Sequence, residues 1–198
     1  MPQIILASKS PRRLEVLRRF FTDLRVMPSD VEVRAHRDEA LRPRELALLK
    51  AEDVRSKVEK DSIIMAADTM VFVDDRALGK PSSAEEAREF LILLSGRTHR
   101  VVTGYAILTR SKVISGSVET LVKFRELSEE TIEWYVSTGE PLDKAGGYGI
   151  QGLGGVLVEE IHGDFYNVVG MPMEAVWRLL QLIDNRPWYQ RSHGHPFS

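Results

Sequence analysis

Two arginines, Arg12 and Arg13, follow Ser10 and Pro11 at the point where an apolar run over residues 3–7 gives way to helical spacing. A helix with Ser10 as its N-cap and Pro11 at its first position leaves free backbone N–H groups at its positive end. Arginine adds planar pairs of donors that suit phosphate oxygens. The segment therefore predicts a polyphosphate or phosphate-ester site, with an exposed and solvated first helical turn as the alternative.

Asp68 directly follows a second apolar run, over residues 63–67, of the kind that forms a buried parallel strand. At the carboxyl end of such a strand, an aspartate meets the ligand crevice and can hold a divalent cation or take a proton from water. A simple turn cap is the alternative. Lys80, restrained between Gly79 and Pro81, would neutralise developing charge if it lay near a phosphate.

Lys50 lies three residues after Ala47 and four before Val54, so it falls within the apolar stripe of an expected helix. A lysine in such a position usually extends its ammonium group to water. If the stripe faces the sheet near its carboxyl edge, the ammonium would instead reach the crevice.

Gly147, Gly149 and Gly152 match the spacing of a dinucleotide-binding fingerprint, but a strand-like segment over residues 156–161 follows where a helix should begin. This order excludes a Rossmann site. The alternatives are a flexible turn, or a loop whose backbone approaches a flat ligand while the amide of Gln151 offers a donor and an acceptor to a base.

Other chemistries are disfavoured by the residues that the chain lacks or scatters. The chain has no cysteine, its five histidines lack zinc-ligand spacing, and Ser8 and Ser10 have no identifiable triad partners. The formal net charge of -2 argues against stable nucleic acid binding. No apolar run approaches the ~20 residues of a membrane span, and no basic segment precedes the first one. We therefore expect a cytoplasmic protein that does not bind membranes.

Strands and helices alternate along the 198 residues, which favours an α/β fold. We expect one domain over 1–184 and an irregular tail over 185–198, where the sequence has no periodicity. Strands are predicted over 3–7, 63–67, 101–108 and 113–124, and helices from Pro11, over 44–58, after Ser83, from Ser128 to Gly139 and from Pro172.

Several short motifs occur in the order in which they occur in one known family. They are Leu-Ala-Ser-Lys-Ser-Pro-Arg-Arg at 6–13, Ala-Asp-Thr at 67–69, Gly-Lys-Pro at 79–81, Leu-Ser-Gly-Arg-Thr-His at 94–99, Asp-Lys-Ala-Gly-Gly-Tyr at 143–148, Ile-Gln-Gly at 150–152, Gly-Asp-Phe at 163–165 and Val-Val-Gly-Met-Pro at 168–172. Over residues 3 to about 183 the chain resembles the Maf family of nucleoside triphosphate pyrophosphatases, which is related in fold to the ITP pyrophosphatases.

The resemblance implies a mixed central sheet flanked by helices, with a ligand cleft at the strand ends. It implies hydrolysis of a nucleoside triphosphate to the monophosphate and pyrophosphate with a divalent cation, Mg²⁺ or Mn²⁺. It further implies the branch that acts on dTTP and UTP, in which the positions of Arg12, Thr69 and Gln151 bear on base choice. The implied site residues are Asp68, Lys50 and Lys80 for catalysis, Ser8, Arg12, Arg13, Thr69 and Gln151 for substrate binding, and Glu32 with Asp68 for the metal.

The residues and the resemblance together predict that water activated by Asp68, directly or through the metal, attacks the α-phosphorus. A nucleotide-binding regulator of cell division without turnover is the alternative. The predicted partner is the nucleoside triphosphate substrate, and a homodimer is a further prediction.

Overall fold

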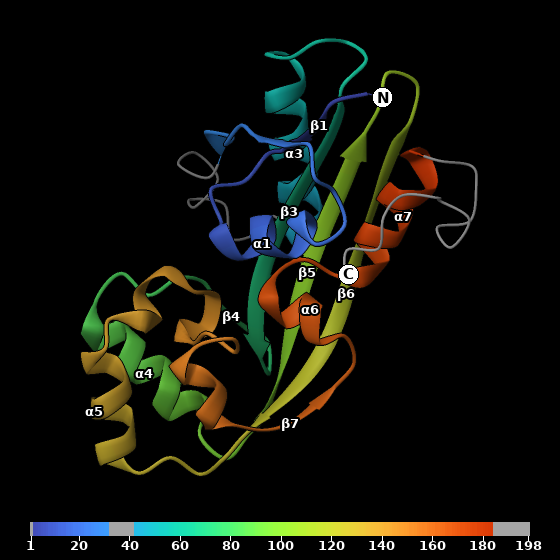
Figure 1. Ribbon diagram of the computed structural model, residues 1–198. Coiled ribbons are helices and arrows are strands. Elements are labelled where there is room, and N and C mark those ends of the chain that lie inside the picture. The colour runs from blue at the N-terminus through green and yellow to red at the C-terminus, as the bar shows by residue number, and fades with distance from the viewer. Residues whose placement is uncertain (1, 32–41, 184–198) are drawn as a thin grey trace, which may run out of the picture.

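The computed structural model describes residues 2–31 and 42–183. Glu32, one of the two predicted metal ligands, and the tail over 185–198 lie outside the described residues. One long twisted sheet runs through the described part of the molecule, with helices packed along it (Figure 1).

The sheet is mixed, as the resemblance implied. Its strands lie in the order β2-β1-β3-β5-β6-β7, with β4 paired to β3. Strand β1 is parallel to β2 and β3, whereas the other pairs are antiparallel. The strand bounds are β1 (Ile4–Leu6), β2 (Leu24–Val26), β3 (Ile63–Val73), β4 (Arg76–Leu78), β5 (Thr98–Leu108), β6 (Val113–Phe124) and β7 (Val158–His162).

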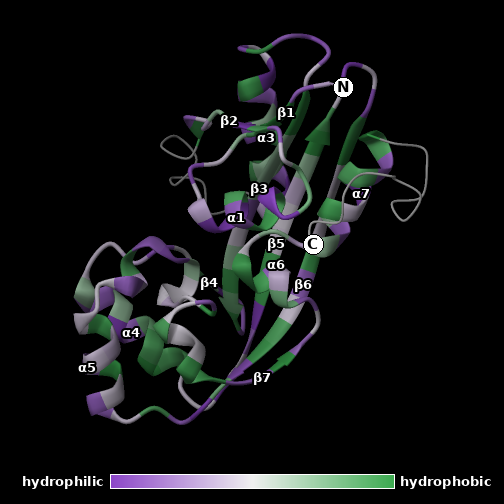
Figure 2. Cartoon of the chain, viewed as in Figure 1, coloured by the Kyte–Doolittle hydropathy of each residue, from purple (hydrophilic) through white to green (hydrophobic). Residues whose placement is uncertain are grey.

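Helices cover both faces of the sheet and one end of it. Helices α1 (Pro11–Arg18), α6 (Phe165–Val169) and α7 (Met173–Ile183) pack on one face, and α3 (Pro43–Arg55) packs on the other. Helices α4 (Ala84–Leu94) and α5 (Glu129–Ser137) form a separate apolar cluster with the start of β5 and the end of β6. Figure 2 shows hydrophobic residues along much of β5, which is buried between these layers.

Three predicted helix starts are confirmed by their caps. The hydroxyl oxygens of Ser10, Ser83 and Ser128 accept hydrogen bonds from the backbone N–H groups three residues later. Pro11 occupies the first turn of α1, where its missing N–H costs nothing. These caps fix where α1 begins, and therefore where Arg12 and Arg13 lie.

The prediction that an apolar strand ends at Ala67 is wrong. Strand β3 continues to Val73, so Asp68 lies in its middle rather than at its carboxyl end. Antiparallel pairing with β5 extends the strand, since Asp68 pairs with Gly104 and Thr69 with Thr103.

A gap along one edge of β3 positions the site. On this edge β1 pairs with residues 63–65 and β4 pairs with residues 71–73. Among the described residues, no strand pairs with 66–70 on this edge, and Asp68 and Thr69 lie in that interval. The gap arises because β1 ends at Leu6, where the chain turns towards α1.

Candidate active site in the cleft beside β3

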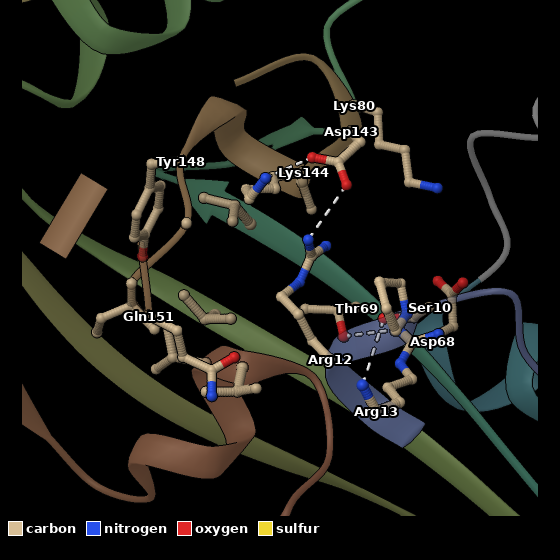
Figure 3. A pocket seen from close by; sticks show the side chains of 18 of the residues that line it. Ser10, Arg12, Arg13, Asp68, Thr69, Lys80, Asp143, Lys144, Tyr148 and Gln151 are labelled. Atoms are coloured by element: carbon tan, nitrogen blue, oxygen red, sulfur yellow. Dashed lines mark hydrogen bonds and ion pairs between the residues drawn. The ribbon is translucent and has the colours of Figure 1, made fainter. Parts of the chain in front are cut away.

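A cleft of about 280 Å³ opens at the gap along β3. Its walls come from the start of α1, from β3, from Lys80 and from the segment that contains η1 (Glu140–Asp143) and η2 (Ala145–Gly147) (Figure 3). Seven of the predicted site residues line it: Ser8, Arg12, Arg13, Asp68, Thr69, Lys80 and Gln151.

The side chain of Lys50, on α3, reaches Asp68 at the edge of the cleft. Its side chain is 4% exposed, and Nζ lies 2.5 Å from Oδ1 of Asp68, whose side chain is 13% exposed. A lysine in an apolar stripe usually extends its ammonium group to bulk water. The ammonium group of Lys50 is instead held inside the protein.

The alternation of β3 explains why two neighbouring side chains have different partners. Ala66 and Asp68 lie on the sheet face covered by α3, whereas Ala67 and Thr69 lie on the face covered by α1. Asp68 therefore meets Lys50 of α3, and Thr69 meets the guanidinium of α1. Both side chains still line the cleft because the strand edge between them is uncovered.

Arg13 is buried and ties three segments together. Its guanidinium donates to the carbonyl of Gly170 at 2.9 Å, to Oγ of Ser8 at 3.1 Å and to Oγ1 of Thr69 at 3.0 Å. The hydroxyl of Thr69 also lies 3.0 Å from that of Thr103 on β5. Arg13 thus fixes the position of Ser8 and Thr69 as well as contributing a positive charge to the cleft.

Arg12 lies across the cleft opening from Asp143. The two side chains form an ion pair at 3.2 Å, and Asp143 also pairs with Lys144. Asp143, Lys144 and Lys9 also line the cleft but are not among the predicted site residues. The pair at 143 and 144 was visible only as part of a family motif, because its partner, Arg12, is 131 residues away in sequence.

The cleft is basic although the chain is not. Among its lining residues are five basic side chains, Lys9, Arg12, Arg13, Lys80 and Lys144, and two acidic ones, Asp68 and Asp143. The whole chain has a formal net charge of -2. The local excess of positive charge suits a polyanion such as a triphosphate.

The opposite side of the cleft carries Tyr148 and Gln151, away from Asp68 and Lys80 (Figure 3). Tyr148 is buried against Phe124, and its hydroxyl lies 2.8 Å from Nε2 of His99. Burial lowers the pKa of His99 to about 4 and raises the pKa of Tyr148. Both groups are therefore neutral near pH 7, and Tyr148 lines the cleft beside Gln151 while His99 lies buried behind it.

Two glycines of the glycine-rich loop pack against side chains of the protein itself. A Cβ at Gly154 would lie 2.5 Å from the hydroxyl oxygen of Tyr135, and one at Gly152 would overlap Oε2 of Glu140. These glycines are required by the protein's own side chains.

The cleft offers one described carboxylate of the predicted metal pair. No group of three or more His, Asp or Glu side chains that could hold a metal occurs within residues 2–31 and 42–183. Mg²⁺ commonly binds one or two carboxylates together with substrate phosphates, so Asp68 in a phosphate-binding cleft fits such an ion. Over the same ranges, no helix has both the length and the apolar character of a membrane span.

Comparison with known proteins agrees with the geometry. The Maf-like protein family matches residues 3–183. A protein of Thermococcus gammatolerans named dTTP/UTP pyrophosphatase is 54% identical over 179 residues, covering 90% of this chain and 96% of the relative. A protein of Pyrococcus furiosus with the same name is 53% identical over 184 residues, covering 92% and 96%.

A more distant relative of that name, from Bacillus cytotoxicus, is 46% identical over 187 residues, covering 93% of this chain and 97% of the relative. Among solved structures, the Staphylococcus aureus Ham1 protein aligns over 91% of this chain and 96% of its own, with 15% identity and a TM-score of 0.46. With the family match extending over nearly the whole chain, this protein belongs to the Maf-like protein family.

Proposed function

We propose that this protein hydrolyses dTTP and UTP to the monophosphate and pyrophosphate, and so removes these nucleotides from the cellular pool. The observation that carries the proposal is the cleft that combines the Lys50–Asp68 ion pair and five basic side chains with Tyr148 and Gln151 on the side opposite Asp68. The names of relatives about half identical in sequence support the same substrates.

The proposed reaction begins with water beside Asp68. The water oxygen forms a bond to the α-phosphorus, its proton passes to the Asp68 carboxylate, and the bond from the α-phosphorus to the bridging oxygen breaks. Pyrophosphate leaves with the electron pair of that bond. Lys50 holds Oδ1 of Asp68 and thereby orients the carboxylate towards the cleft.

The basic side chains would offset the charge of the substrate and of the leaving group. A triphosphate carries about four negative charges, and positioned cations stabilise the additional charge that develops on the leaving pyrophosphate. Lys80 and Arg12 lie in the cleft wall, where they can meet phosphate oxygens. Arg12 would then leave Asp143 and contact a phosphate oxygen of the substrate.

A divalent cation, Mg²⁺ or Mn²⁺, is part of the proposal, with Asp68 and Glu32 as its protein ligands. When bound, such an ion lowers the negative charge on the phosphates and acidifies a coordinated water. A cytoplasmic location and a homodimer stay predictions.

Pyrophosphate release from a panel of nucleoside triphosphates tests the proposal. The panel contains dTTP, UTP, CTP and the purine triphosphates, each assayed with Mg²⁺, with Mn²⁺ and with a chelator. We expect dTTP and UTP to be the best substrates, with monophosphate and pyrophosphate formed in equal amounts. Preference for a purine triphosphate would contradict the pyrimidine assignment, and nucleotide binding without pyrophosphate release would favour the regulator without turnover.

A further inference from the structure

The carboxylate of Glu140 is enclosed by the loop that carries Gln151. Its Oε2 accepts the backbone N–H of Leu153 at 3.0 Å, and its Oε1 accepts the backbone N–H of Gly154 at 3.0 Å. The hydroxyl of Tyr135, on α5, donates to Oε1 at 2.8 Å. Three donors therefore converge on one side chain just outside the cleft.

The same network reaches the other side of Gln151. The hydroxyl oxygen of Tyr135 accepts the backbone N–H of Gly149 at 2.9 Å, while its proton is donated to Glu140. Tyr135 is fully buried, so this contact is shielded from water. The backbone is thus fastened two residues before Gln151 and again two and three residues after it.

The glycines of the loop fit around this network. A Cβ at Gly149 would lie 2.5 Å from Cε of Lys144 and 2.9 Å from Oε1 of Glu140, one at Gly152 would overlap Oε2 of Glu140, and one at Gly154 would lie 2.5 Å from the hydroxyl oxygen of Tyr135. Of the glycines that resemble a nucleotide-binding fingerprint, Gly149 and Gly152 therefore leave room for side chains of the protein itself, Lys144 and Glu140.

The charge state of Glu140 agrees with this role. Burial alone would raise the pKa of Glu140, but the N–H groups of Gly154 and Leu153 and the hydroxyl of Tyr135 lower it below its ordinary value. The group is ionised at neutral pH and can accept all three donors.

We propose that Glu140 is a positioning residue for base selection, which holds the Gln151 loop in the conformation that reads the pyrimidine. The inference rests on the proposed function, because it assigns Glu140 to the discrimination that Gln151 is proposed to make. Glu140 need not touch the substrate. Its effect on the reaction passes through the backbone of residues 149–154.

Glu140→Gln tests the assignment with little change of shape. The amide places an NH₂ group where the carboxylate accepts hydrogen bonds, so one donor of the network meets another donor and the loop shifts. We expect kcat/KM for dTTP to fall by at least about tenfold and the ratio of kcat/KM for dTTP over CTP to fall by at least about fivefold. Glu130→Gln, an exposed change on α5, is the matched control and should change neither.

Inorganic tripolyphosphate tests the phosphate end of the cleft separately from the base end. As a competitive inhibitor it should bind Glu140→Gln and the wild type equally, within about twofold, because it lacks a base. A loss of tripolyphosphate affinity as large as the loss on dTTP would overturn the assignment to base selection.

A double variant separates positioning from general support of the fold. If Glu140 acts through Gln151, then Glu140→Gln should not lower the dTTP over CTP ratio further in a Gln151→Ala background. A further fall of the same size there, or an unchanged ratio in folded Glu140→Gln, would overturn the proposal. If Glu140→Gln does not fold, Tyr135→Phe removes the hydroxyl that joins Glu140 to Gly149 and is measured in its place. Failure of both variants to fold would assign Glu140 to stability and overturn its role in selection.

The wild-type panel distinguishes this inference from the proposed function. If the wild type does not release pyrophosphate from dTTP or UTP, the proposed function fails. If the wild type hydrolyses both and the ratio does not respond to Glu140→Gln, only the Glu140 inference fails.

Discussion

The ammonium group of Lys50 and the carboxylate of Asp68 form an ion pair at 2.5 Å at the back of the cleft, with side-chain exposures of 4% and 13%. A pair this buried depends on both partners, because either charge alone would lack its main compensation. The pair joins α3 to the uncovered edge of β3. It therefore connects the stability of the fold to the proposed chemistry.

Lys50→Met should reduce kcat/KM by at least about a hundredfold, which corresponds to roughly 2.7 kcal/mol of lost transition-state stabilisation. The apolar stripe alone predicts that methionine would pack at this position without a loss of stability. Because the ion pair is present, we instead expect Lys50→Met to lower the free energy of unfolding by about 3 kcal/mol.

Denaturant unfolding of Lys50→Met, Asp68→Asn and the double variant measures the stability effect. The double variant should recover most of the loss seen in Lys50→Met. Lys57→Met, which breaks the exposed pair with Asp53, is the control. A normal reaction rate in Lys50→Met would show that this lysine has a structural role alone.

Asp68→Asn should abolish hydrolysis while the nucleotide still binds, because it removes the proposed proton acceptor and keeps the shape of the side chain. Asp75→Asn, in the exposed turn between β3 and β4, is the matched control. Pyrophosphate release and nucleotide binding are measured on both. Activity of Asp68→Asn within about tenfold of the wild type would refute the catalytic assignment.

The start of α1 and the place of Lys50 on the apolar face of α3 could be predicted from local sequence, whereas the burial of the Lys50 ammonium group and the contacts that complete the site could not. Ser10 and Pro11 specify a helix start through backbone chemistry alone, and the spacing around Lys50 places it on the buried face of α3. By contrast, β3 continues past Ala67 because β5 pairs with it. That pairing leaves no signal in the sequence around Ala67, so the end of the strand could not be predicted there.

The same limit applies to Arg13 and to the short elements. Arg13 donates to a carbonyl 157 residues away, which no local spacing reveals. Strands β2 and β4 have three residues each, too few for a period to show. The role of Glu140 could not be predicted from local sequence, because only its contacts with the backbone of Leu153 and Gly154 reveal it.

Gln151→Glu should lower activity on dTTP and UTP far more than on CTP. The amide can present a donor and an acceptor to O4 and N3–H of uracil or thymine, whereas the carboxylate keeps only acceptors. Each unpaired polar group in the pocket costs about 1–3 kcal/mol, enough for a clear change in preference. Steady-state kinetics on the three substrates checks this. Equal losses on all three would mean that Gln151 only shapes the loop.

His99 should make the fold sensitive to acid. Its pKa falls from 6.5 to about 4 in the folded protein because burial disfavours the charged ring. The unfolded chain therefore binds a proton that the folded chain does not, and stability is lost as the pH falls from about 6.5 towards about 4, by up to about 3 kcal/mol.

Denaturant unfolding of the wild type and of His99→Gln at a series of pH values measures this loss. Glutamine keeps a polar partner for Tyr148 and does not titrate, so the variant should lose less stability than the wild type over the same interval. Identical pH dependence in the two proteins would contradict the assignment to His99.

Hydrolysis of dTTP in water labelled with a heavy oxygen isotope tests the central claim most directly. If water activated at Asp68 attacks the α-phosphorus, mass spectrometry will find the label in the thymidine monophosphate and none in the pyrophosphate. Label in the pyrophosphate, or formation of the diphosphate and orthophosphate, would contradict the account.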